Sequence, residues 1–132
     1  MFDERMISGD SLQANQRFVA KMQVRLPWYR ALPLSCVERI ELMIDGKEIS
    51  RGDLHLGIYG QTYSLERLHD LPNVLWFQLD TADLYAELDE PVSQGEHEVR
   101  VAIEIKIPYS SKPFRQVAHC TKSLMLSMEK WL

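Results

Sequence analysis

Residues 96–107, EHEVRVAIEIKI, hold the clearest local pattern in the chain and decide its fold class. Large apolar side chains occupy every second position, and polar or small residues lie between them. These apolar residues are Val99, Val101, Ile103, Ile105 and Ile107. A helix would scatter the β-branched side chains around its axis, so the period of two predicts a strand with one buried face. Pro108 is expected to end the strand, because proline lacks the N–H donor of the ladder.

Further strands are expected on both sides of this stretch. Phe18–Leu26 alternates with Phe18, Ala20, Met22, Val24 and Leu26 on one face. Val37–Ile44 also alternates and leads directly into Asp45-Gly46, a pair suited to the positive φ of a tight hairpin turn. Shorter strands are expected at Leu54–Tyr63, Val74–Leu79, Leu84–Leu88 and Cys120–Met128, with one or two helical turns at Ser64–His69.

Seven or eight short strands, punctuated by Gly, Pro and Asp-Gly, predict an all-β protein. The expected architecture is an antiparallel β-sandwich, immunoglobulin-like or jelly-roll-like, with at most one short helical turn. A length of 132 residues matches one domain, so a single β-sandwich domain is expected over residues 1–132.

Composition excludes several classes of function. The net charge of −4 gives no basic footprint, so nucleic acid is not expected as a partner. No apolar run approaches the ~20 residues of a membrane helix. The polar stretch Met1–Arg5 lacks the apolar region of a signal peptide, and a cytoplasmic location is expected. Cys36 and Cys120 are too few for a disulfide framework and lie in no zinc-binding spacing.

No catalytic or metal-binding constellation is visible in the sequence. The four histidines, His55, His69, His97 and His119, lack the spacing of metal ligands. Because neighbouring strand residues face opposite sides, Glu96-His97-Glu98 is interpreted as a solvated hairpin end. For the same reason His119 and Cys120 are not expected to form a catalytic pair. A group of carboxylates is interpreted as a solvated, charge-rich sheet edge. Its members are Asp80, Asp83, Glu87, Asp89 and Glu90.

One connection, Leu26–Ser35, is unusually apolar for a segment between two strands. Two interpretations are equally supported: the loop plugs the end of the sandwich, or it contacts a partner through residue types enriched in interface hot spots. A similar stretch, Ile107–Arg115, would extend the patch if both loops lie at one end. The candidates for a partner interface or a substrate mouth are Pro27, Trp28, Tyr29, Arg30, Leu32, Pro33, Leu34, Tyr109, Phe114 and Arg115.

The stretch Arg25–Ser35, followed by Ile40–Gly46, resembles the small β subunits of bacterial C-glycoside deglycosidases. Those subunits carry a similar Arg-Ile-Pro-Tyr-Tyr-Arg-Gly-x-Pro-Leu-Ser stretch and then a strand that ends in Asp-Gly. Agreement continues at Tyr63–Leu68 and at Gly95–Val99, so that the resemblance covers most of the chain. The chain departs from the pattern where tyrosine, glycine and methionine are usual. These positions are Trp28, Ala31 and Cys36.

The resemblance implies a subunit of a hetero-oligomeric carbon–carbon lyase. Its partner would be a larger, sugar-isomerase-like TIM-barrel α subunit that holds a divalent metal, usually manganese. The substrate would be a 3-oxo-C-glycoside of a flavonoid or similar phenol. A base would remove the acidified C2 hydrogen while the metal polarises the ketone, and the bond from C1 to the aryl carbon would then break by elimination. The resemblance implies no catalytic residue and no cofactor in this chain.

The expected role is therefore that of a small non-catalytic subunit, which stabilises the barrel. Trp28, Tyr29 and Arg30 are candidates for walling the substrate mouth. The alternative is a stand-alone carbohydrate-binding or adaptor sandwich that uses the same aromatic residues as a sugar platform. A small hydrolase with an unrecognised site is disfavoured by the scattered histidines.

Overall fold

The computed structural model describes residues 6–14, 19–90, 92–93 and 95–128, and this part of the chain is built from strands. The strands are β1 (Ile7–Ala14), β2 (Val19–Arg25), β3 (Leu32–Pro33), β4 (Val37–Ile44), β5 (Lys47–Ile49), β6 (Leu54–Ile58), β7 (Gln61–Ser64), β8 (Leu75–Trp76), β9 (Thr81–Glu87), β10 (Glu96–Ile107) and β11 (Phe114–Met128). Three short 3-10 helices connect them, η2 (Leu34–Cys36), η3 (Arg51–Asp53) and η4 (Leu65–Asp70). The prediction of an all-β sandwich is confirmed.

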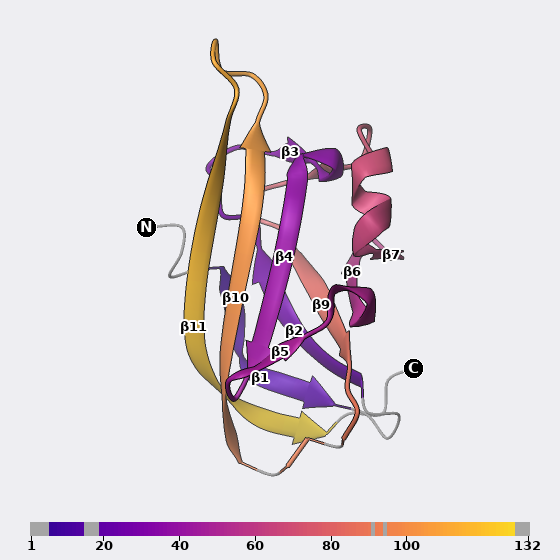
Figure 1. Ribbon diagram of the computed structural model, residues 1–132, viewed down its shortest axis with the longest axis vertical. Coiled ribbons are helices and arrows are strands. Elements are labelled where there is room, and N and C mark those ends of the chain that lie inside the picture. Colours follow the sequence, from indigo (N-terminus) through magenta and orange to yellow (C-terminus); the bar gives the residue numbers. More distant parts are fainter. Residues whose placement is uncertain (1–5, 15–18, 91, 94, 129–132) are drawn as a thin grey trace.

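Nine strands form one sheet in the order β5-β4-β10-β11-β1-β2-β9-β6-β7, and β3 pairs with β8 separately. This sheet folds over on itself, so that β4, β10 and β11 lie in front of β2 and β9 (Figure 1). The register of β1 against β2 shifts between Ser8 and Gln13, and such an irregularity lets a strand bend. The pairs are antiparallel except for β1 and β11, which run parallel.

The apolar faces of the strands meet in one buried cluster. On β10, Val99, Val101, Ile103 and Ile105 are fully buried, as their alternation predicts. On β2, Ala20, Met22 and Val24 are at most 2% exposed. Phe18, predicted to belong to the same face, lies outside the described residues. Both cysteines are buried and free.

Several strand predictions need correction. The predicted strand Leu54–Tyr63 is two strands, because the chain turns at Tyr59-Gly60 with φ of 51° and 78°. Glycine is usual at a turn position with positive φ and tyrosine is not, so Tyr59 gave no turn signal in the sequence. The predicted strand at Val74–Leu79 is reduced to the two residues of β8. β1 was not predicted, because its sequence ISGDSLQA has few large apolar residues.

Helical structure in the described residues is limited to three 3-10 helices, and η4 lies where the helical turns at Ser64–His69 were predicted. Each has only three to six residues. Segments this short show no helical periodicity in sequence, and 3-10 turns are common connectors. None of the helices within the described ranges is long and apolar enough to cross a membrane.

The acidic stretch around Asp83 and Glu87 was expected at a sheet edge, but β9 pairs with β2 on one side and with β6 on the other. The small residues of β9 explain this position, since Ala82 and Ala86 turn inward with Leu84 and are buried. The carboxylates occupy the opposite parity and face outward. Alternation therefore places an acidic strand inside the sheet.

Replacing Ile103 by aspartate should unfold the domain, because the change buries an unpaired charge where the native side chain is fully buried. We expect a loss of about 3 kcal/mol or more in the free energy of unfolding, measured by urea denaturation. Arg100→Asp, on the exposed face of the same strand, is the control and should cost about 1 kcal/mol or less. Equal losses from both variants would contradict the assigned faces of β10.

Candidate functional site

Two sites lie at opposite ends of β10. His97 follows the first residue of this strand, and Ile107 is its last residue. At about 3.3 Å per residue, the two ends are roughly 33 Å apart. The β10–β11 connection extends beyond the rest of the sandwich at one end, and the β4–β5 turn lies at the other (Figure 1).

The first site is an aromatic patch made by the two loops singled out from the sequence. We define it by Trp28, Tyr29, Arg30, Tyr109 and Phe114. The indole Nε1 of Trp28 donates a hydrogen bond to the hydroxyl of Tyr109. The Trp28 ring lies 4.9 Å from Tyr29 and 6.2 Å from Phe114, centroid to centroid. The Arg30 guanidinium carbon lies 4.4 Å from the centroid of the Tyr109 ring, within cation–π range. The two loops therefore share one end of the sandwich.

The remaining predicted residues divide between the core and the surface. Pro27, Leu32 and Leu34 are buried and anchor the loop in the domain. Pro33 is half-buried and pairs with β8. Arg115 is exposed, with its Nε 3.4 Å from Oε1 of Glu38. The flanks of the loop therefore plug the end of the sandwich, and its middle is exposed to solvent. Contact of the middle with a partner stays a prediction.

The aromatic patch is suited to contact rather than to proton transfer. Tyr29, Tyr109 and Phe114 are 54%, 44% and 42% exposed. A hydrogen bond with Tyr109, helped by partial burial, raises the pKa of the Tyr29 hydroxyl, which therefore stays protonated at neutral pH. Trp28 is half-buried and contacts Tyr29, Tyr109 and Phe114, so the patch is ordered in the absence of a partner.

The second site is a cavity of about 410 Å³ at the other end of β10. Apolar side chains line part of it, namely those of Ile44, Ile49, Leu88 and Val92. Carboxylates dominate the remainder, namely Asp45, Glu48, Asp53, Glu87, Asp89 and Glu90. Lys47 points toward Asp89 and forms an exposed ion pair with a distance of 3.7 Å between Nζ and Oδ2.

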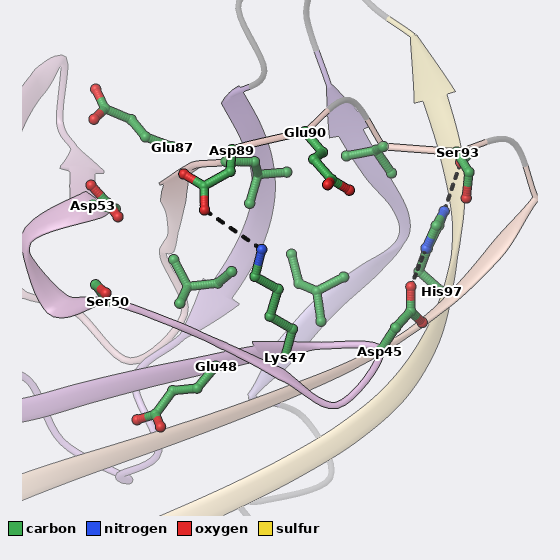
Figure 2. A pocket seen from close by; sticks show the side chains of 14 residues that line it. Asp45, Lys47, Glu48, Ser50, Asp53, Glu87, Asp89, Glu90, Ser93 and His97 are labelled. Carbon is green, nitrogen blue, oxygen red and sulfur yellow. Dashed lines mark hydrogen bonds and ion pairs between the residues drawn. The ribbon is translucent and has the colours of Figure 1, made fainter.

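His97 lies against this cavity and is only 5% exposed. Its Nδ1 is 2.6 Å from Oδ2 of Asp45, and its Nε2 is 2.7 Å from the carbonyl oxygen of Ser93 (Figure 2). Both partners are acceptors, so the geometry suits an imidazolium that donates from both nitrogens. Asp45 Oδ1 also accepts the Glu98 N–H at 2.9 Å. His97 therefore ties the Asp45-Gly46 turn to the start of β10.

This arrangement corrects the expectation of a solvated hairpin end at His97. The signal was present in the sequence, because His97 has the same parity as Val99 and so faces the core. Burial by itself lowers the pKa of His97, but the hydrogen bonds to Asp45 and Ser93 outweigh it and raise the pKa above its ordinary value. The hydrogen bond from His97 lowers the pKa of Asp45.

His97 is not placed to act as a base or a metal ligand, because both of its ring nitrogens are engaged. Burial raises the pKa of the Cys36 thiol, which disfavours the reactive thiolate. Within the described ranges, no group of three or more His, Cys, Asp or Glu side chains could hold a metal ion.

A family model described as C-glycoside deglycosidase beta subunit matches residues 2–109. The chain belongs to this family. The matched span includes β10 and ends at Tyr109, so that it contains four of the five residues of the aromatic patch. Phe114 and β11 lie beyond it.

Individual relatives agree with the family match. A C-glycoside deglycosidase beta subunit from Arthrobacter globiformis is 42% identical over 90 residues, which are 68% of this chain and 69% of the relative. A protein of the same name from Microbacterium trichothecenolyticum is 38% identical over 109 residues, 83% of this chain and 82% of the relative. A 3'-dehydrocarminate deglycosidase beta subunit from a Microbacterium species is 35% identical over 109 residues, 83% and 81% of the two chains.

The stability of the domain should fall as the pH rises through the folded-state pKa of His97. Because this pKa is raised, protonated His97 stabilises the fold fully below its unfolded value of about 6.5, and the contribution is lost above the folded value. For Asp45 the pH dependence of stability is opposite. Because its pKa is lowered in the folded state, the Asp45 carboxylate stabilises the fold, and this stabilisation is lost as the pH falls through the folded-state pKa. Urea denaturation between pH 5 and 9 measures the first effect.

Asp45→Asn is the sharpest variant for this prediction, since Asn-Gly keeps the turn and removes the carboxylate. It should weaken the fall in stability between neutral and mildly alkaline pH, whereas His69→Gln, at an exposed position, should leave the fall unchanged. A wild-type profile that is flat across this range would contradict the prediction.

Proposed function

We propose that this chain is the small, non-catalytic β subunit of a metal-dependent C-glycoside deglycosidase. Its partner would be a larger TIM-barrel α subunit, and the complex would work in the cytoplasm. The main support for the proposal is the family match over residues 2–109. It is supported by an ordered aromatic patch at the end of the sandwich, where a partner can reach it.

The aromatic patch has the composition of an interface anchor. Tryptophan, tyrosine and arginine are the residues most enriched among interface hot spots. The contacts of Trp28 and Arg30 with Tyr109 hold these side chains in place before binding. Less conformational entropy is then lost on association. We propose that the patch docks on the larger subunit, beside the mouth of its active site.

The proposed reaction cleaves the carbon–carbon bond between sugar and aglycone in a 3-oxo-C-glycoside. The ketone acidifies the hydrogen on C2, and a base takes this proton. The electrons of the C2–H bond form a double bond to C1, and those of the C1–aryl bond leave with the aglycone carbon, which is then protonated. The products are a sugar enone and the free aglycone. The name of one relative refers to a 3'-dehydro compound, which supports this class of substrate.

Base and metal would belong to the larger subunit under this proposal. The present chain would stabilise that subunit and shape the approach to its active site. Trp28 is larger than the tyrosine usual at this position of the family and would narrow the space for the aglycone. A stand-alone carbohydrate-binding domain is the competing function, and it predicts binding of saccharide without any partner.

Co-expression with the proposed isomerase-like α subunit should give a complex that co-purifies and turns over a 3-oxo-C-glycoside. Size-exclusion chromatography and detection of the released aglycone measure the two results. The isolated chain, stripped of metal, should release none. Saccharide binding by the isolated chain together with failure to co-purify would overturn the proposal in favour of the carbohydrate-binding function.

Arg30→Ala and Trp28→Ala should each weaken the complex by about 2 kcal/mol, which is roughly 30-fold in Kd. Arg30 is exposed, so its loss should leave the unfolding transition unchanged, whereas Trp28 requires a parallel stability measurement. Met125→Ala is the matched control, because Met125 is 51% exposed and pairs with Glu96 at the opposite end of β10. Wild-type affinity in both test variants would exclude the aromatic patch as an anchor.

A further inference from the structure

A second group of exposed apolar side chains was not singled out from the sequence. Four residues form it, and we call them the Tyr59 ridge: Tyr59, Leu75, Phe77 and Leu79. Their side chains are 51%, 41%, 48% and 83% exposed. They lie on the turn between β6 and β7 and on the segment that contains β8 and leads to β9. Large apolar side chains that gather on a surface mark an interaction site more often than single ones do.

The ridge is held rigidly by Tyr59. Its φ of 51° lies in the left-handed region, which is uncommon and strained for an aromatic residue. The Tyr59 hydroxyl donates to Oδ2 of Asp80 at 2.6 Å and accepts the Phe77 N–H at 3.2 Å. The rings of Tyr59 and Phe77 meet edge to face, with centroids 6.4 Å apart.

The segment beneath these side chains is fixed to the core. Trp76 is fully buried, and its Nε1 donates to the carbonyl oxygen of Asp80 at 2.9 Å. The Asp80 N–H donates to the carbonyl oxygen of Phe77 at 3.0 Å, which closes a turn. Because the backbone of this segment is fixed, Phe77 and Leu79 stay exposed and cannot turn inward to pack on the core.

Strand pairing places the ridge beside the aromatic patch. Arg25, the last residue of β2, pairs with Thr81 at the start of β9. Leu32, the first residue of β3, pairs with Trp76 of β8. The β2–β3 and β8–β9 connections therefore run antiparallel and are held together at both ends. The first connection carries part of the aromatic patch, and the second carries part of the Tyr59 ridge.

We propose that the aromatic patch and the Tyr59 ridge form one continuous docking surface for the larger subunit. This inference rests on the proposed function and extends it to residues that sequence reasoning missed. A standard interface takes about 20–30 residues from each partner, and the five residues of the aromatic patch fall far short of that number. The ridge is the adjoining apolar surface at the same end, so a partner seated on the patch covers it.

The charges and polar groups of this surface indicate which side chains the larger subunit should place opposite it. The carboxylate of Asp80 already accepts a hydrogen bond from Tyr59, and the neighbouring Gln61, Thr62 and Gln78 are uncharged. Among the nine residues that define the aromatic patch and the Tyr59 ridge, Arg30 is the cation. The matching surface of the larger subunit should be apolar opposite Phe77 and Leu79, with hydrogen-bond acceptors opposite Arg30.

The test measures the affinity of the full-length chain for the purified larger subunit by isothermal titration calorimetry. Leu79→Ser removes the most exposed side chain of the ridge and should weaken binding at least 10-fold while leaving the thermal unfolding transition in place. Tyr59→Phe keeps the ring but removes both hydrogen bonds of the hydroxyl, and should weaken binding severalfold. Met125→Ser is the control at the opposite end and should bind as the wild type does.

Three results would overturn the inference. If Leu79→Ser and Tyr59→Phe bind as the wild type does while Arg30→Ala does not, the ridge lies outside the interface and the proposed function stands. If Leu79→Ser instead abolishes self-association of the isolated chain and leaves binding to the larger subunit intact, the ridge takes a second copy. If the wild-type chain fails to bind the larger subunit, the proposed function fails together with the inference.

Discussion

Strand β10 pairs on both of its sides, and this pairing sets the positions of its neighbours and of both sites. All twelve of its residues, Glu96–Ile107, pair with β11, and the central part pairs with β4 from Val99 to Ile105. Its inward side chains are buried along the whole strand. Because a shift of one residue would exchange the apolar and charged faces, the hydrophobic pattern fixes the register of both neighbours. The two ends of β10 in turn fix the positions of the two sites.

These two ends have different chemistry. At the start of β10, His97 and Asp45 form a charge-assisted contact beside a cavity rich in carboxylates, and the contact joins one turn to one strand. At the far end, aromatic side chains from separate connections gather around Tyr109 and remain exposed. The first arrangement satisfies its own hydrogen bonds and contributes to stability. The second leaves apolar surface exposed to water, and burial of this surface by a partner would release free energy.

Much of the fold follows from local sequence. β4 and β10 have the bounds that alternation predicts, and the turn at Asp45-Gly46 has positive φ at both residues. The placement of Trp28 beside Tyr109 could be suggested but not deduced, since 81 positions separate them. The buried His97 was misjudged because its flanking glutamates suggested solvent. Its parity with the apolar residues of the same strand was the better guide.

The strand class, the buried faces and the family could be predicted from the amino-acid sequence, because they depend on periodicity and on residues that are neighbours in the chain. Which loops meet became visible only in the folded chain. The Tyr59 turn illustrates the reason: its geometry matches the Asp45-Gly46 turn, yet tyrosine occupies a position where local preference disfavours it. The hydroxyl contacts with Asp80 and Phe77 hold it there. Such contacts join residues distant in sequence, and no local pattern encodes them. The apolar end of the sandwich that results is therefore a property of the fold.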